Sequence, residues 1–222
     1  MAGGKGERLL PLTKHLPKPM AVIKGRPFLE HQLKLIRQFG FKDIVLLVGY
    51  LGRHVQDYFG DGKKINLRIK YSFEKKLLGT AGALKHAERK LEDEFLLLNG
   101  DTYLVMDYSR FIKEFRKHRL LGMVAVYRGR EKNLAKNIAV NGADLITGYN
   151  KTDPRGMSHV DSGVMVFKKD ILDLIPQNAA FPLEKLFCRL IRMKQLAGYR
   201  IRRRFYDMGS PSGLMLVRRK LP

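Results

Sequence analysis

Residues 43–50 read DIVLLVGY, an almost continuous apolar run that ends at a glycine and a tyrosine. A strand buried on both faces has this pattern, and such strands belong to parallel sheets that are covered by helices. Residues 28–39 precede the run with apolar side chains at helical spacing, and Gly40 is placed to end that helix. A helix that leads into a buried strand indicates an α/β fold.

Helical and strand patterns alternate along the rest of the chain. Further strands are expected at residues 67–73, 95–98, 122–128, 137–140, 145–149 and 161–167. Further helices are expected at residues 54–59, 80–91, 108–118 and 182–195, with a helical turn at 171–174. This alternation favours a Rossmann-like three-layer α/β/α fold with a mixed, mostly parallel central sheet. The length of 222 residues fits one core, so we expect a single domain over residues 1–222.

The composition is that of a folded, strongly basic protein. Lys and Arg number 43 against 21 acidic residues, which gives a formal net charge of +22. Because the basic residues are spread along the chain, we interpret most of this charge as solvated surface with salt-sensitive adhesion to nucleic acid. We find no apolar run of the roughly 18 residues that a membrane span needs, and no signal peptide. The single cysteine, Cys188, lies in an apolar stretch, so we expect a cytoplasmic protein without a membrane partner.

The N-terminal segment combines glycines with cations. Residues 2–9 read AGGKGERL, and residues 17–20 read PKPM. Glycine lets consecutive backbone N–H groups point at one anion, so the segment suits a phosphate chain whose charge Arg8 and Lys18 would neutralise. The spacing is neither that of a Walker A loop nor that of a dinucleotide-binding fingerprint. From residue types alone, a phosphate cradle and a plain loop are equally good interpretations.

Two aspartates are placed at expected strand ends, where α/β sheets bind ligands. Asp101 follows the 95–98 strand and a glycine, and Asp207 lies between bulky apolar residues and a Gly-Ser-Pro turn. Two carboxylates from separate strands would hold Mg²⁺ and leave positions open for phosphate oxygens. The alternative for Asp101 is a turn residue that caps the next helix.

A second glycine site reads GTAG at residues 79–82 and opens the expected 80–91 helix. A flat group would pack against this backbone while helix N–H groups remain available to it. The alternative, which the residues slightly favour, is an N-cap at Thr80 with tight packing of the helix. Lys151 is a candidate phosphate contact but is one of 43 basic residues. The 6 histidines have no ligand spacing and are assigned to neither metal binding nor catalysis.

Taken in order, these segments resemble the sugar-1-phosphate nucleotidyltransferases, also called nucleoside-diphosphate-sugar pyrophosphorylases. The signature of that family is a Gly-Gly-x-Gly-x-Arg-Leu loop followed by Pro-Leu-Thr and Pro-Lys-Pro. This chain has these three motifs at residues 3–9, 11–13 and 17–19. Further matches are Leu-Gly-Thr-Ala-Gly at 78–82, Leu-Asn-Gly-Asp at 98–101, Ser-Gly-Val at 162–164 and Tyr-Asp-Met-Gly-Ser-Pro at 206–211. The likeness covers essentially the whole chain, and the pattern is most similar to the short heptose-1-phosphate guanylyltransferases.

The resemblance implies that a phosphate oxygen of a sugar 1-phosphate attacks the α-phosphorus of a nucleoside triphosphate and releases pyrophosphate. Such chemistry depends on positioning and on charge stabilisation. The catalytic residues implied are Arg8, Lys18 and Asp101, and the Mg²⁺ ligands are Asp101 and Asp207. The implied nucleotide contacts are Ala2, Gly3, Gly4, Gly6, Glu74, Gly79 and Thr80. The implied sugar-phosphate contacts are Asn150, Lys151 and Asp161.

Substrate choice within the family rests on three of these positions. Glu74 precedes Gly79, where the family reads the base, and a carboxylate accepts two hydrogen bonds from the N1–H and N2–H₂ edge of guanine. Uracil and thymine offer one donor there, so GTP is favoured, with UTP, dTTP or CTP as alternatives. Asp161 replaces a usual Asn and Asn150 replaces a usual Glu. Both departures touch the sugar subsite, so the expected acceptor is a heptose or related hexose 1-phosphate.

Two other functional classes remain open from the sequence. One is a nucleic-acid or polyanion-binding protein that keeps the fold without catalysis, and the other is a sensor of nucleotide-sugars. We expect no specific nucleic-acid partner, and a homodimer is compatible with the sequence.

The resemblance also concerns the start of the chain. It implies a buried strand of about five residues directly before the glycine loop, where this chain has only Met1. We therefore expect the sequence to begin inside a longer reading frame, with the first strand of the central sheet truncated and the loop poorly anchored.

Overall fold

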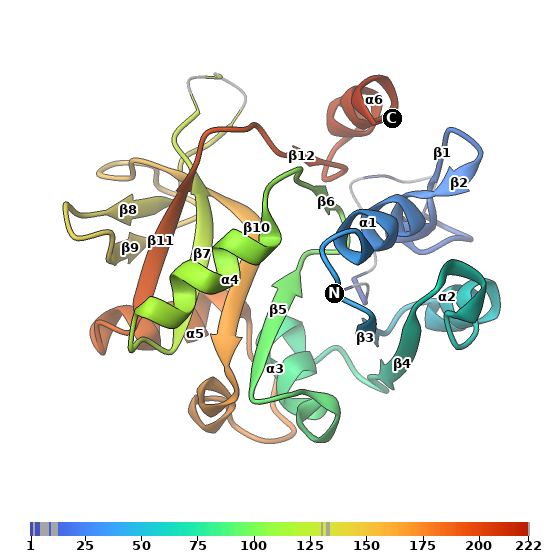
Figure 1. Cartoon of the computed structure of the whole chain (residues 1–222), viewed down its shortest axis with the longest axis horizontal. Helices are drawn as coiled ribbons and strands as arrows, with labels where there is room; N and C mark the ends of the chain where they lie inside the picture. Colours follow the sequence, from blue (N-terminus) through green and yellow to red (C-terminus); the bar gives the residue numbers. More distant parts are fainter. Residues whose placement is uncertain (2, 5–8, 10–12, 130, 132–133, 222) are drawn as a thin grey trace. The chain divides into compact units, whose positions relative to one another are not determined.

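The computed structural model describes residues 1, 3–4, 9, 13–129, 131 and 134–221 (Figure 1). Contacts divide the chain into two compact units. Unit 1 comprises Met1–Leu77, Asn99–Val105 and Phe205–Pro222, and unit 2 comprises Leu78–Leu98 and Met106–Arg204. Unit 1 is thus assembled from three segments that are far apart in the sequence. The single domain over residues 1–222 stays a prediction.

Unit 2 contains a four-stranded sheet in the order β11-β7-β10-β5 (Figure 1). The strands are β11 (Leu196–Ile201), β7 (Gly122–Tyr127), β10 (Val160–Lys168) and β5 (Glu94–Leu98). β11 runs parallel to β7, whereas β10 runs antiparallel to both of its neighbours. The sheet is therefore mixed, as the sequence predicts. Its centre is apolar because β7 and β10 are buried on both faces.

Helices lie on both faces of this sheet (Figure 1). On one face, α4 (Tyr108–Lys117) packs the ring of Phe111 edge-on against Tyr199 of β11, with 5.2 Å between the ring centroids. The other face carries α3 (Gly79–His86) and α5 (Leu183–Arg192). A small antiparallel hairpin of β8 (Ile138–Val140) and β9 (Ile146–Tyr149) lies beside the sheet. Unit 2 also has two 3₁₀ segments, η4 (Glu88–Lys90) and η5 (Lys169–Leu174).

Unit 1 contains a parallel pair of strands and several helices. The pair is β3 (Asp43–Val48) and β4 (Arg68–Phe73), and the helices are α1 (Phe28–Arg37), α2 (Gly52–Phe59) and α6 (Pro211–Lys220). Two short antiparallel pairs are β1 (Val22–Ile23) with β2 (Arg26–Pro27) and β6 (Thr102–Tyr103) with β12 (Tyr206–Asp207). The 3₁₀ segments η2 (Lys18–Met20) and η3 (Lys63–Ile65) also belong to this unit.

The structure confirms most of the expected elements. The 28–39 helix becomes α1, and Gly40 follows it with a positive φ of 86°, the conformation of a helix-terminating glycine. The run at residues 43–50 becomes β3, paired in parallel with β4. The alternating segments of unit 2 likewise form β5, β7, β8, β9 and β10.

Other elements differ from expectation. The helix expected at residues 182–195 ends at Arg192, and Lys194 has a positive φ of 55°, so the chain turns and enters β11. The sequence LAGYRI of β11 lacks a long apolar run, which is why periodicity misses it. Helix α6 was also missed, although its start carries a signal: Ser210 accepts a hydrogen bond from the N–H of Gly213 at 3.1 Å, and Pro211 occupies the first helical position.

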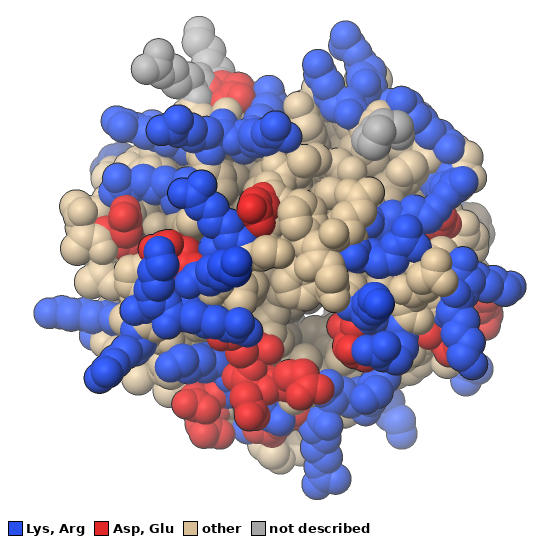
Figure 2. Space-filling model, viewed as in Figure 1, with Lys and Arg blue, Asp and Glu red and all other residues tan. Residues whose placement is uncertain are grey.

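The basic side chains are spread over the surface. Figure 2 shows Lys and Arg across most of the visible face, with acidic side chains gathered in a few places. This distribution agrees with our interpretation of most of the charge as solvated surface. Within the described part of the chain, no helix has both the length and the apolar composition needed to cross a bilayer.

Candidate active site

Asp101 lies just beyond β5, in the segment of unit 1 that is formed by Asn99–Val105. Its oxygen Oδ2 accepts a hydrogen bond from the ammonium group of Lys18, and the two side chains form an ion pair. The Lys18 side chain is 11% exposed and that of Asp101 is 30% exposed. Because separating the pair would leave a charge in a partly desolvated place, each side chain fixes the other.

The alternative role for Asp101, a cap on the next helix, is wrong. Helix α4 begins after Asp107, and the carboxylate of Asp107 accepts a hydrogen bond from the N–H of Arg110 at 2.8 Å. Asp107 therefore supplies the cap, and the Asp101 carboxylate is directed at Lys18 instead.

Asp207 lies beside Asp101 because β12 pairs with β6. In this antiparallel ladder Asp207 is the partner of Thr102, and the N–H of Met208 donates to the carbonyl of Asp101 at 2.9 Å. The oxygen Oδ1 of Asp207 accepts a hydrogen bond from the N–H of Gly209 at 2.7 Å. The structure thus brings together, at neighbouring positions of one ladder, the two residues that the sequence proposes as metal ligands.

The donor set of this pair fits Mg²⁺. The ion prefers oxygen ligands and is commonly held by one or two carboxylates together with water and substrate phosphates. Among the described residues, no group of three or more His, Cys, Asp or Glu side chains is placed to hold a metal. Two adjacent aspartates therefore suit an ion that completes its coordination with phosphate oxygens.

Gln32 positions the segment that carries Asp101. Its amide Nε2 donates to the carbonyl of Asn99 at 2.8 Å and to the carbonyl of Thr102 at 2.6 Å. The side chain comes from α1 and is buried, so one amide group holds the backbone on both sides of Asp101. The sequence offered a signal that we did not use, namely a glutamine on the buried face of an amphipathic helix.

Gly3 and Gly49 make room for the carboxylate of Glu74. A Cβ atom on Gly3 would lie 2.8 Å from Oε1 of Glu74, and one on Gly49 would lie 2.7 Å from the same oxygen. The carbonyl of Gly3 also accepts a hydrogen bond from the N–H of Tyr50 at 3.3 Å. Glu74 therefore lies directly against the backbone of the N-terminal loop.

The other predicted contacts of this loop are only partly described. Ala2, Gly6 and Arg8 lie outside the described residues. Gly4 is exposed, and a Cβ there would meet no atom within 4 Å.

The second glycine site, in unit 2, is closed by backbone packing. Gly79 has a positive φ of 68°, and a Cβ on it would lie 3.0 Å from the carbonyl oxygen of Phe181. That same oxygen accepts hydrogen bonds from the N–H groups of Ala81 and Gly82 at 3.0 Å, so these two helix donors are not available to a ligand. The residue before the helix is Leu78, so the expected N-cap at Thr80 is wrong, while the expected tight packing is confirmed.

Asp161 lies at a bulge near the start of β10. The pairing with β7 shifts register between Asp161 and Met165, and Gly163 has a positive φ of 73°. This turn directs the N–H of Gly163 to Oδ1 of Asp161 at 2.8 Å. Burial raises the pKa of Asp161, while this hydrogen bond and the charge of Lys151 oppose the rise.

Tyr149 lies next to both Asp161 and Lys151, two of the predicted sugar-phosphate contacts. Its hydroxyl hydrogen-bonds the Asp161 carboxylate, and burial, followed by the charge of Asp161, raises the pKa of Tyr149. The ammonium of Lys151 lies 5.8 Å from the centre of the Tyr149 ring. Asn150 is used locally, since its Oδ1 accepts three hydrogen bonds at 3.0 Å from Thr152 and from the N–H of Asp153. Sequence reasoning missed Tyr149.

The sequence and the fold of this chain are similar to those of known proteins. The family model described as nucleotidyl transferase matches residues 1–222. This chain belongs to the nucleotidyl transferase family. Its relatives transfer guanylyl or uridylyl groups to sugar 1-phosphates, and this nucleotidyl transferase is an enzyme of the same kind.

Three relatives define the range of similarity. The nucleotidyl transferase is 30% identical over 185 residues to D-glycero-alpha-D-manno-heptose 1-phosphate guanylyltransferase of Campylobacter jejuni, covering 83% of this chain and 81% of that enzyme. It is 31% identical to UTP–glucose-1-phosphate uridylyltransferase of Synechocystis, covering 86% and 54%, respectively. It is 30% identical to mannose-1-phosphate guanylyltransferase of Mycobacterium tuberculosis, covering 95% and 60%. The chain thus spans little more than half the length of the last two enzymes.

Solved structures share the fold. HddC from Yersinia pseudotuberculosis superposes with a TM-score of 0.84 at 24% identity, covering 100% of this chain and 97% of that chain. UDP-glucose pyrophosphorylase from Acinetobacter baumannii gives a TM-score of 0.79 at 17% identity, covering 98% and 90%. These matches establish the Rossmann-like fold of the nucleotidyl transferase.

The two hydrogen bonds donated by the Gln32 amide give a first prediction. Gln32→Leu keeps the shape of the side chain but leaves two carbonyl groups without their donor, so the free energy of unfolding should fall by about 1–3 kcal/mol. Urea denaturation measures the change. Gln38→Leu, at an exposed position next to the same helix, is the control and should change stability by less than about 0.5 kcal/mol. Equal stability of the two variants would show that the two hydrogen bonds from Gln32 contribute nothing to the free energy of unfolding.

The half-buried residue Asp161 gives a second prediction. Its native pKa is raised above the ordinary value of 3.8, so between these two values the native state binds more protons than the unfolded chain. The free energy of unfolding therefore falls as the pH rises through this window. Asp161→Asn keeps an oxygen acceptor for Gly163 and cannot ionise. We expect this variant to match the wild type in Tm near pH 4 and to exceed it at higher pH.

Asp170→Asn, which removes an exposed carboxylate from the same unit, is the control for this pH series. A difference between Asp161→Asn and the wild type that stays constant from pH 4 to pH 8 would contradict the assignment of a raised pKa to Asp161.

Proposed function

We propose that this enzyme transfers a guanylyl group from GTP to a sugar 1-phosphate and releases pyrophosphate. The observation that carries the proposal is the ladder of β6 and β12, which places the Lys18–Asp101 ion pair beside Asp207. A cation and two carboxylate residues on hydrogen-bonded backbone segments suit a reaction that gathers phosphate charge. The family membership and the match to guanylyltransferases support the same reaction class.

In the proposed reaction, an oxygen of the sugar phosphate attacks the α-phosphorus of GTP. A bond forms between these atoms, the bond to the bridging α–β oxygen breaks, and pyrophosphate leaves with the electron pair. The chain needs to supply no covalent intermediate, because alignment and charge stabilisation carry such a displacement. Lys18 is placed to neutralise phosphate oxygens as a point charge, since its ammonium already rests against Asp101.

Asp101 and Asp207 are the residues that would hold Mg²⁺. When bound, the ion supplies charge neutralisation and a fixed geometry for phosphate oxygens. The ammonium of Lys18 neutralises Asp101. On substrate binding, Asp101 would exchange this ammonium for the metal ion, and Lys18 would exchange the carboxylate for phosphate oxygens. Gln32 keeps Asp101 in place during this exchange because it holds the backbone rather than the carboxylate.

Glu74 is the proposed reader of the base. Its carboxylate lies against Gly3 and Gly49, beside the loop that the family uses for nucleotides. Two carboxylate oxygens accept the N1–H and N2–H₂ donors of guanine, whereas uracil offers one donor on the corresponding edge. Guanylyl- and uridylyltransferases are both present among the relatives, so the proposed preference for GTP rests on the hydrogen-bonding chemistry of this carboxylate.

For the acceptor we propose a heptose 1-phosphate or a related hexose 1-phosphate. Two relatives of similar length are heptose-1-phosphate guanylyltransferases, and the chain covers 81% and 96% of them. In unit 2, Lys151 offers a cation for the phosphate, and Asp161 with Tyr149 offers an acceptor and a hydroxyl for the sugar. Asn150 has its oxygen engaged within a turn, so its proposed contribution is limited to the amide donors.

An activity matrix of four triphosphates against several sugar 1-phosphates tests this function. We expect pyrophosphate release with GTP to have a kcat/KM at least tenfold above that with UTP. Glu74→Gln turns one acceptor into a donor and should lower kcat/KM for GTP by about tenfold or more, with a smaller effect for UTP.

Glu92→Gln, an exposed glutamate, is the matched control and should leave both triphosphates unaffected. A wild-type preference for UTP or dTTP would contradict the role of Glu74. No pyrophosphate release in any combination, at protein concentrations that give a folded enzyme, would contradict the proposed function itself.

The proposed metal ligands give a separate prediction. A chelator should abolish pyrophosphate release, and Asp207→Asn should raise the Mg²⁺ concentration for the half-maximal rate by about tenfold or more, because one of two carboxylate ligands is lost. Asp57→Asn, at an exposed position of α2, is the control for the change in charge. An unchanged Mg²⁺ dependence in Asp207→Asn would remove this residue from the metal site.

A further inference from the structure

A basic cavity in unit 2 is lined by residues other than those proposed for the sugar phosphate. It has a volume of about 850 Å³, and the described residues that line it are Arg128, Lys136 and Arg202 together with Tyr127, Gly129, Glu131 and Ile201. A second hollow of about 540 Å³ shares Arg128, Ile201 and Arg202 with it and adds His159 and Arg200. Such volumes are in the range of small-molecule sites.

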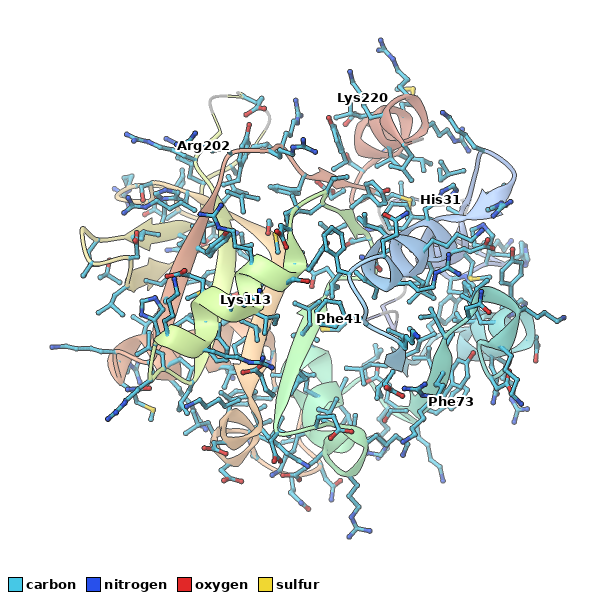
Figure 3. All side chains as sticks on the ribbon, viewed as in Figure 1. His31, Phe41, Phe73, Lys113, Arg202 and Lys220 are labelled. Atoms are coloured by element: carbon cyan, nitrogen blue, oxygen red, sulfur yellow. The ribbon has the colours of Figure 1, made fainter. Side chains whose placement is uncertain are left out.

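The topology of the sheet explains why cations gather here. β7 and β11 are parallel, and Tyr127 is paired with Ile201 at their last residues. Arg128 and Arg202 directly follow these two residues, so both leave the sheet at the same carboxyl edge. Figure 3 shows Arg202 just beyond the end of β11. The carboxyl edge of parallel strands is where α/β sheets bind ligands.

Three of these cations have no acidic partner in the described part of the chain. No ion pair joins Arg128, Lys136 or Arg202 to an aspartate or glutamate there. Arg200 differs, since its guanidinium lies 2.9 Å from the carboxylate of Asp144. Among the described residues, the cavity therefore carries positive charge that no acidic side chain pairs with.

Glu131 is the acidic residue among the described lining residues, and its carboxylate interacts with Tyr127 and Arg204. Its Oε1 accepts a hydrogen bond from the hydroxyl of Tyr127 at 3.1 Å and lies 3.5 Å from the guanidinium of Arg204. Its Oε2 is buried and lies 2.7 Å from the position of a Cβ on Gly129. Glu131 thus fixes the wall of the cavity and leaves the three cations unneutralised.

The neighbouring His159 is affected by the positive charges of the same cavity. His159 is 5% exposed, and its Nδ1 lies 2.7 Å from the hydroxyl oxygen of Ser158. Burial lowers the pKa of His159, and the charges of Arg200, Arg128 and Lys136 lower it further, against the opposing charge of Asp144. The cationic side chains are therefore close enough together to act on one point.

We propose that this cavity, defined by Arg128, Lys136 and Arg202, binds a small polyphosphorylated compound through residues other than those proposed for catalysis. Guanidinium groups bind phosphate through two parallel hydrogen bonds, and the two arginines lie at the ends of neighbouring strands. Lys136 adds a third positive charge from the connection before β8. Arg130, Lys132 and Asn133 lie outside the described residues and are not part of the proposed site.

The test uses inorganic tripolyphosphate as the probe, with the full-length enzyme in a chelator at fixed ionic strength. Hydrogen–deuterium exchange at residues 196–202, followed against probe concentration, gives a dissociation constant for this place alone. We expect protection there, and we expect Arg128→Ala/Arg202→Ala to weaken the apparent affinity at least tenfold. Arg192→Ala/Arg203→Ala removes the same charge from two exposed positions outside the cavity and should change the affinity less than twofold.

Two results would overturn the proposal. One is the absence of protection at residues 196–202, and the other is an equal loss of affinity in both double variants, which would assign binding to the net charge of +22 rather than to the cavity. If the first double variant does not fold, Lys136→Gln replaces it, with an expected loss of at least threefold. Lys18→Ala should leave this protection unchanged, so failure of the proposed catalytic function and failure of this site are distinguishable.

Discussion

Unit 1 depends on the fixation of a short backbone segment, residues 99–103, by groups that are remote in the sequence. The amide of Gln32 holds the carbonyls of Asn99 and Thr102, and the ladder with β12 holds Thr102 and Tyr103. The carbonyl of Met1 accepts a hydrogen bond from the N–H of Gly100 at 2.7 Å. These bonds satisfy polar groups that would otherwise be costly to bury. They also determine where the Asp101 carboxylate stands.

The ion pair of Lys18 and Asp101 follows from that fixed backbone. An ion pair between mobile surface groups contributes little, because ordering two side chains costs entropy. Here Lys18 is mostly buried and Asp101 is held on both sides, so much of the ordering has been achieved by the fold. The arrangement leaves an ion pair whose ammonium group and carboxylate are both held in place by the fold.

Unit 2 contains charged side chains in two different environments. At the β10 bulge, the carboxylate of Asp161 lies beside a tyrosine hydroxyl and a backbone N–H, and its pKa rises because these donors do not fully replace water. At the carboxyl edge of β7 and β11, three cations stay on the surface of a cavity without an acidic partner in the described residues. The first arrangement suits a neutral polar ligand group, and the second suits an anion.

The sequence by itself determined the elements with strong periodicity, the family and the residue types of the site. Apolar runs specify β3, β5, β7 and β10 because a buried strand needs little else. β11, the roles of Gln32 and Tyr149, and the closing of Gly79 by Phe181 were decided only by the tertiary structure. Each depends on a partner distant in sequence, and local patterns do not record which backbone carbonyl or strand edge a residue will meet. The meeting of Asp101 with Asp207 is of the same kind, since the pairing of two-residue strands leaves no periodic signal.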